Sequence, residues 1–231
     1  VIFNDTTGVK ALLVAPYLDS DIAILDAQLT VGLPASITAD TGMDALTHAV
    51  EAIVCPVSNA FTNGFCFSAV EHIFRALPVC VTNGRNVQAR EEMLQAACMA
   101  TWALGNAVGA APVHNCSHAL GALYHIPHGR ANGVLLPVVM EELIEFYLPY
   151  AGDLAKAFAV PLATPEATVR AVIACIKQLQ KDTGMPTHFG EFKIPPNEME
   201  RIVIAIATDP LAALYQIPPE KIVAIVSRVL G

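Results

Sequence analysis

The sequence predicts a mainly α fold, in which a helical domain covering residues 34–231 follows a short segment, residues 1–33, that contains strand-like apolar runs. Apolar residues make up 54% of the 231 residues and charged residues only 15%, against a usual charged share of about 25%, which leaves ample material for a buried core. Beyond Pro34 the apolar residues recur with helical spacing. Before Pro34 the apolar runs are shorter and have the length of buried strands.

The segment before Pro34 contains two such runs, ALLVAP at 11–16 and DIAILD at 21–26, each bounded by Pro, Asp or Ser. We expect both runs to be buried strands. Because two strands do not form a stable domain alone, we interpret residues 1–33 as the end of a larger β-containing domain.

From Pro34 onward, the expected helices end at clusters of Pro, Gly and Asn, such as CPVSN at 55–59 and TGMP at 183–186. Thr164 followed by Pro165 predicts a helix start, because Thr caps the first turn and Pro fits the first helical position. We expect helices at about 41–54, 62–77, 87–106, 112–124, 130–146, 150–159, 164–182, 197–207 and 218–229.

The composition also disfavours several classes of partner. A net charge of −8 argues against nucleic acid, whose binding depends on clustered Lys and Arg. No uninterrupted apolar run reaches about 18 residues, so we expect no membrane span, and the N-terminal residues do not resemble a signal peptide. The six cysteines are scattered without a CxxC pair, as in reduced proteins. We therefore expect a cytoplasmic protein.

Two short segments, 44–48 (DALTH) and 114–128 (HNCSHALGALYHIPH), hold five of the seven histidines. Asp44 and His48 stand four residues apart, which places both side chains on one face of a helix. His114 and His118 repeat this spacing in another expected helix.

His128 follows Pro127 at an expected turn. Asp and His from one helix, facing two more imidazoles from another element, would give a ligand set of three nitrogens and one oxygen. This set suits Fe²⁺ or Zn²⁺ better than Ca²⁺ or Mg²⁺, which prefer oxygen ligands. The same spacing also fits an Asp–His hydrogen bond on a helix surface or histidines buried in a core. We assign His72 and His188 to structure, and His125 to a pocket wall or to a contact with the ligands.

Three stretches carry a resemblance to a known family: GVKALLVAPYLDSDIAILDAQLT (8–30), LPASITADTGMDALTHAVEA (33–52) and VHNCSHALGALYHIPHGRANGVLLPVVME (113–141). In their order and separation they resemble the iron-containing, or group III, alcohol dehydrogenases over nearly the whole chain. The resemblance implies an α/β dinucleotide-binding domain, of which residues 1–33 would be the C-terminal remnant. It makes residues 34–231 the all-helical, metal-binding catalytic domain of the dehydroquinate synthase-like fold.

The resemblance also implies roles for individual residues. The implied metal ligands are Asp44, His48, His114 and His128. His118 would lie beside the nicotinamide and the substrate as a catalytic residue, either as a proton relay or as a positioning group. Lys10 matches a lysine that contacts the cofactor, and Leu29 falls in the loop that lines it.

The chain departs from the family pattern at three places. Asn63 stands where the family usually has Asp, at a helix start that we expect to be structural. The segment 105–114 is slightly longer than usual and carries Pro112. The Gly-Gly-Gly-Ser loop that cradles the cofactor phosphates is not found in the sequence. We therefore expect this chain to be a C-terminal fragment that is inactive alone.

For the intact enzyme, the resemblance implies reversible hydride transfer between a small alcohol and NAD or NADP, giving an aldehyde or ketone. It implies a homo-oligomer with Fe²⁺ or Zn²⁺ as the metal. One alternative is a related metalloenzyme, similar to glycerol dehydrogenase or dehydroquinate synthase. A second alternative is a domain that binds metal without catalysis.

Overall fold

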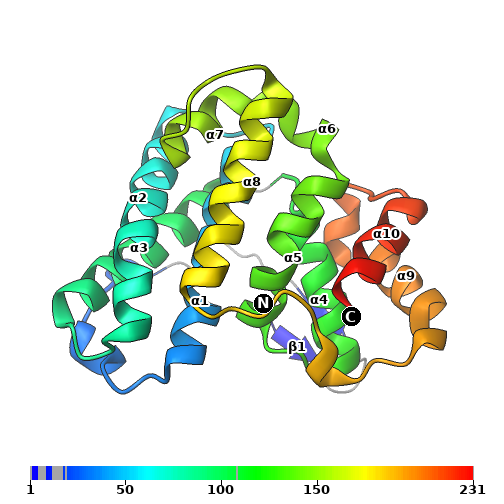
Figure 1. The fold of residues 1–231 in the computed structure, drawn as a ribbon, viewed down its shortest axis with the longest axis horizontal. Coiled ribbons are helices and arrows are strands. Elements are labelled where there is room, and N and C mark those ends of the chain that lie inside the picture. The colour runs from blue at the N-terminus through cyan, green and yellow to red at the C-terminus, as the bar shows by residue number, and fades with distance from the viewer. Residues whose placement is uncertain (1, 5–8, 12–17, 19, 108, 231) are drawn as a thin grey trace.

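The computed structural model describes residues 2–4, 9–11, 18, 20–107 and 109–230, and Figure 1 shows that most of them are helical. Strands β1 (Ile2–Asn4) and β2 (Val9–Ala11) pair antiparallel, with Ile2 opposite Ala11. Short 3₁₀ helices are η1 (Ala27–Thr30), η2 (Leu148–Tyr150), η3 (Gly190–Phe192), η4 (Pro196–Glu198) and η5 (Pro210–Ala213). The α-helices are α1 (Ala35–Ile53), α2 (Ala60–Thr82), α3 (Val87–Asn106), α4 (Pro112–Tyr124), α5 (His128–Glu142), α6 (Ile144–Tyr147), α7 (Ala151–Phe158), α8 (Pro165–Asp182), α9 (Met199–Thr208) and α10 (Pro219–Val229).

Helix α1 is central to the core. It packs against α2, α3 and α5, and Met43, Leu46, Val50 and Ile53 on it are completely buried. These residues recur at helical spacing and form one apolar face. Because α1 and α5 are in contact, the segment around Asp44 lies next to the start of α5.

Helix α5 is a second centre of packing, since it contacts α4, α8 and α10 as well as α1. Figure 1 shows α2 and α3 on one flank of the molecule and α9 and α10 on the opposite flank, with α4 and α5 between them. Helix α1 is therefore a neighbour in space of α4 and α5, which lie far from it in the sequence. This arrangement brings the two histidine-rich segments together.

Side-chain caps explain where several helices begin. The Asn59 side chain accepts from the backbone N–H groups of Phe61 and Thr62 at the start of α2, and Thr62 reciprocates in a capping box. The expected start at Thr164 is confirmed, because its hydroxyl accepts from Ala167 N at 3.3 Å with Pro165 as the first helical residue. Such caps satisfy backbone N–H groups that have no partner inside the helix.

The prediction of a buried strand at 21–26 is wrong. Residues 22–26 have no regular secondary structure, and Ile22 and Ile24 are 81% and 88% exposed. Asp26 caps η1 instead, by accepting from Gln28 N at 2.9 Å. A strand is stable only beside another strand, and no described strand pairs with this run. The other expected strand, 11–16, starts at the last residue of β2, and residues 12–16 lie outside the described part.

Two helix boundaries also differ from expectation. Helix α1 begins at Ala35 rather than near residue 41. Its first turns bury polar side chains, which give no apolar periodicity in the sequence. Thr38 accepts from Arg90 Nη1 at 2.8 Å, and Asp40 pairs with Arg130 Nε at 2.7 Å. Helix α2 continues through Pro78 to Thr82. Burial of Cys80 in this last turn stabilises the continuation.

Helix α2 is the one helix in the described residues that is long and apolar enough, by length and composition alone, to cross a membrane. It packs against α1, α3 and α7, and the core helices of soluble proteins meet the same criterion. The finding is weak evidence for a membrane span, and the absence of membrane association stays a prediction.

Candidate metal centre

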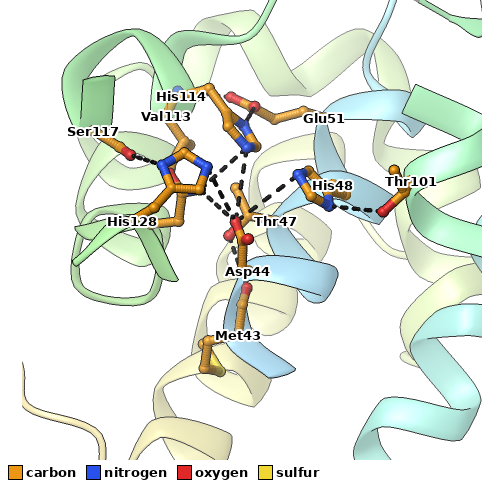
Figure 2. Close-up of polar contacts among 11 residues, drawn as sticks. Met43, Asp44, Thr47, His48, Glu51, Thr101, Val113, His114, Ser117 and His128 are labelled. Atoms are coloured by element: carbon orange, nitrogen blue, oxygen red, sulfur yellow. Dashed lines mark hydrogen bonds and ion pairs between the residues drawn. The ribbon is translucent and has the colours of Figure 1, made fainter. Parts of the chain in front are cut away.

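Three helices supply the side chains of the candidate site. Asp44 and His48 point from one face of α1, His114 comes from the first turn of α4, and His128 is the first residue of α5 (Figure 2). Pro127 ends the preceding loop in an extended conformation and so fixes the start of α5. Gly129, the residue after His128, makes the close approach of α5 to α1 possible, because a Cβ there would lie 2.5 Å from the backbone oxygen of Asp40.

The four side chains converge on one point. Each offers one ligand atom, and the four atoms all lie within 4.8 Å of one another. Oδ1 of Asp44 is 3.9 Å from Nε2 of His48, 3.8 Å from Nε2 of His114 and 3.7 Å from Nε2 of His128. The rings of His48 and His114 stack with their centroids 4.9 Å apart. The separations are those of ligands around one small ion.

The charges of the cluster favour a cation. Burial lowers the pKa of His48 to about 4, with the neighbouring His114 acting in the same direction against the attraction of Asp44. At neutral pH, His48 is therefore an uncharged imidazole, whose nitrogen lone pair is free to bind a metal ion. For Asp44 burial raises the pKa, but the histidines and a hydrogen bond from Asn132 outweigh burial and lower it, so the carboxylate is ionised.

A buried glutamate holds one of these imidazoles in position. Glu51 is completely buried on α1, its Oε1 accepts from the backbone N–H of Val113 at 2.6 Å, and its Oε2 contacts Nδ1 of His114 in a short hydrogen bond. This contact directs Nε2 of His114 toward Asp44. A carboxylate that fixes the ring of a metal-binding histidine is a common feature of metal sites.

Three further polar contacts position the cluster. The buried amide of Asn132 donates to Oδ1 of Asp44 at 2.5 Å and lies close to Nε2 of both His114 and His128. Thr101 Oγ1 lies 3.4 Å from Nδ1 of His48, and Ser117 Oγ lies 3.1 Å from Nδ1 of His128. Figure 2 shows both hydroxyls at the outer edge of the cluster, on the side of each imidazole away from Asp44.

A cavity of about 230 Å³ adjoins the cluster. The imidazoles of His48, His114, His118 and His128 line it together with residues of α3 and of the region around η5. His118 is buried, and its ring centroid is 5.3 Å from that of His128. A small molecule in this cavity would therefore contact His118 and the three imidazoles of the donor cluster.

The donor chemistry fits a divalent transition metal. Three imidazole nitrogens and one carboxylate oxygen suit Fe²⁺ or Zn²⁺, and the cluster contains no thiolate of the kind found in closed structural zinc sites. The four residues named from the sequence, Asp44, His48, His114 and His128, are thus brought together, while their binding of a metal stays a prediction.

The other candidate residues lie apart from the four donors. His125 ends α4 in a left-handed conformation (φ 55°), is exposed and does not line this cavity. Leu29 is 83% exposed in η1. Lys10 lies in β2 opposite Phe3, and its side chain lies outside the described part. Cofactor contacts by Lys10 and Leu29 stay predictions.

His72 and His188 make local structural contacts, as expected. Nδ1 of His72 lies 2.9 Å from Arg75 Nη2, and Nδ1 of His188 accepts from Gly190 N at 3.1 Å. Asn63 Nδ2 donates to Asp153 at 3.4 Å, in keeping with the structural role expected for it.

Sequence reasoning missed Glu51 and Asn132. Glu51 follows His48 by three residues and Asn132 follows His128 by four, so both lie on the helix faces that carry the ligands. That spacing is the one sequence signal for both residues, and it is too common in helices to identify either of them by itself.

The fold and the donor set define a helical domain with a candidate divalent-metal centre beside a cavity. Residues 38–230 match the family model described as "Fe-containing alcohol dehydrogenase family, C-terminal". The chain therefore belongs to the iron-containing alcohol dehydrogenase family, as the resemblance implied.

Individual relatives agree with this assignment. The chain is 38% identical over 199 residues to long-chain-alcohol dehydrogenase 1 of Geobacillus thermodenitrificans, a match covering 84% of this chain and 49% of the relative. It is 39% identical over 197 residues to 1,3-propanediol dehydrogenase of Klebsiella pneumoniae, covering 84% and 50%. Among solved structures, the iron-containing alcohol dehydrogenase of Thermococcus thioreducens superposes with a TM-score of 0.81 at 27% identity, over 94% of this chain and 56% of that one. The chain spans about half the length of the curated relatives it matches.

Proposed function

We propose that the intact protein is a metal-dependent alcohol dehydrogenase that transfers hydride reversibly between a small alcohol and NAD⁺ or NADP⁺, giving an aldehyde or ketone. The observation that carries this proposal is the convergence of four donor atoms within 4.8 Å, three of them from imidazoles that line a cavity. The names of the relatives, which include alcohol and propanediol dehydrogenases, support the same reaction class.

In this proposal Asp44, His48, His114 and His128 hold one Fe²⁺ or Zn²⁺ ion. When bound, such an ion supplies Lewis-acid polarisation of the alcohol or carbonyl oxygen. Glu51 retains the proton on Nδ1 of His114, which leaves the lone pair on Nε2 for binding.

The other catalytic role falls to His118. It lines the cavity beside His128 and takes up the proton that the alcohol loses during oxidation. The alternative role for this residue is to position the nicotinamide. The hydride itself is carried by the nicotinamide cofactor.

The cofactor would be bound mainly by a preceding α/β domain. Residues 1–33 would be the end of that domain, with Lys10 and Leu29 contacting NAD or NADP, and residues 34–231 would be the catalytic metal domain. The chain contains no phosphate-cradling glycine loop and spans half of its relatives, which supports this division. We further propose a soluble, cytoplasmic homo-oligomer that binds neither nucleic acid nor membrane.

Metal analysis combined with an activity assay tests the proposal. In His114→Ala, one ligand is lost and Glu51 loses its imidazole partner, so bound iron or zinc and alcohol-dependent NAD(P) reduction by the intact protein should fall together. His72→Ala is the matched control, because its partly exposed imidazole contacts Glu92 and Arg75, away from the cluster.

Three outcomes are distinguishable. Joint loss of metal and activity in His114→Ala, with both retained in His72→Ala, supports the enzyme. Metal binding without turnover by the intact protein would instead support a non-catalytic metal-binding domain. Turnover by residues 1–231 alone at the rate of full-length relatives would contradict the proposed division into domains.

A further inference from the structure

The cavity beside the metal centre has an apolar wall. Besides the four imidazoles and Thr101, its lining consists of apolar residues and glycines, among them Leu104, Gly105, Leu211 and Leu214. Among the described residues that line it, none is Lys, Arg, Asp or Glu. An anionic group placed against this wall would be desolvated without a counter-charge, which is costly.

Gly105 occupies a special position on this wall. It lies in the last turn of α3 and lines the cavity, and a Cβ built on it meets no atom within 4 Å. Glycine in a helix costs about 0.5–1 kcal/mol relative to alanine. The described residues around Gly105 do not require a glycine there, and its missing side chain leaves open space at the cavity.

We infer that the cavity takes the tail of an uncharged aliphatic alcohol and that Gly105 sets the size of tail that fits. This inference rests on the proposed function, because the hydroxyl end of the substrate is placed at the four donor atoms. The remaining carbon atoms then lie against Leu104, Gly105, Leu211 and Leu214. A side chain at position 105 occupies the same space as the tail.

A substitution series in the intact, metal-loaded protein tests the size limit. Gly105→Ala and Gly105→Leu fill the open space in two steps, and kcat/KM is measured for ethanol and for 1-hexanol. Gly105→Leu should lower kcat/KM for 1-hexanol by about tenfold or more, since each methylene in an apolar pocket is worth about 10-fold or more, and should change the value for ethanol by less than about threefold. Gly105→Ala should act in the same direction by a smaller factor.

Gly64→Leu is the matched control. Gly64 is also an exposed helical glycine whose Cβ would meet no atom within 4 Å, but it does not line the cavity. This variant should leave the ratio of the two kcat/KM values unchanged. An equal effect of the Gly64 and Gly105 variants, or no change of the ratio in Gly105→Leu, would overturn the inference.

The charge preference is tested with 6-hydroxyhexanoate, which matches 1-hexanol in length and adds a carboxylate. It should be turned over at least about tenfold less efficiently than 1-hexanol, because its charge would lie at the apolar wall. Equal efficiency for the two alcohols would overturn the assignment of an uncharged substrate.

Ligand-observed NMR with 1-hexanol separates this inference from the proposed function. If no alcohol is oxidised, the proposed function fails, and the binding experiment still decides the inference. Binding of 1-hexanol that is weakened in Gly105→Leu but not in Gly64→Leu supports it, and binding that is unaffected by Gly105→Leu overturns it.

Discussion

Glu51 uses both of its carboxylate oxygens, one for the backbone N–H of Val113 and the other for Nδ1 of His114. A glutamine has only one oxygen to offer. The Val113 N–H is always a donor and therefore keeps that oxygen, so the amide NH₂ group must face His114. His114 would then accept at Nδ1 and carry its proton on Nε2, the atom directed at Asp44.

Glu51→Gln should consequently weaken metal binding by about 10–100-fold, the usual effect of losing the partner of a metal-binding histidine. Competition titration with a chelator measures this change, and circular dichroism checks that the helices are retained. Glu92→Gln is the control, because Glu92 pairs with Arg75 and His72 away from the cluster. Unchanged affinity in Glu51→Gln would show that His114 does not depend on this contact.

At the residue scale, helical spacing predicted which side chains could share a face, and it placed Asp44 with His48. It could not show that α1, α4 and α5 meet at one point, because that contact depends on the packing of segments up to 88 residues apart, as between Asp44 and Asn132. The family resemblance supplied the four ligands together. Glu51 and Asn132 were missed because their spacing from the ligands occurs at many other positions in any helix.

Among the short elements, η5 is held by a titratable cap. Oδ1 of Asp209 accepts from Leu211 N at 2.9 Å, and Leu211 lines the cavity. Burial raises the pKa of Asp209 from 3.8 to about 6. The folded protein therefore holds a proton on Asp209 at a pH where the unfolded chain has lost it, and the stability from this group is present below about pH 4 and lost as the pH rises through 6.

Asp209→Asn keeps the accepting oxygen and removes the buried charge. It should raise the free energy of unfolding by about 1–2 kcal/mol at pH 7–8, a value reduced from the full shift because the group is partly solvated, and should change little at pH 4. Urea unfolding at pH 4, 6 and 8 measures the difference. The exposed Asp182→Asn variant should show no comparable trend. If Asp209→Asn changed the free energy of unfolding equally at all three pH values, the raised pKa of Asp209 would be contradicted.

Elements with regular apolar spacing and clear turn signals, such as α3 and α4, were predicted from the sequence with their observed bounds. The first turns of α1 were missed because the groups they bury are polar and pair with arginines from other helices. The end of α2 was missed because Pro78 is a helix breaker in general, whereas here the buried Cys80 beyond it favours continuation. In each case a tertiary contact decided the boundary.

For the whole molecule, composition and periodicity predicted the helical domain, but they misassigned the run at 21–26. Its apolar residues indicated a buried strand, whereas Ile22 and Ile24 face solvent in this structure. Neighbouring apolar residues that are all highly exposed are typical of a surface that another part of a protein covers. The sequence pattern indicated burial of this run, and no described part of the chain buries it.

The segment 18–29 should therefore be the first part of the isolated chain to be cut by protease. Leu18, Leu25 and Leu29 are 56%, 40% and 83% exposed, and 22–26 lack regular structure, so few buried contacts oppose local opening. Brief chymotrypsin digestion with mass spectrometry should yield a stable product that begins between residues 19 and 34. Phe61 and Trp102 serve as internal controls, because they are 79% and 47% exposed but lie within α2 and α3 and should be spared.

In the intact protein the proposed cofactor domain would cover the segment 18–29 and slow its cleavage. Equal cleavage rates in the isolated chain and in the intact protein would contradict that domain arrangement.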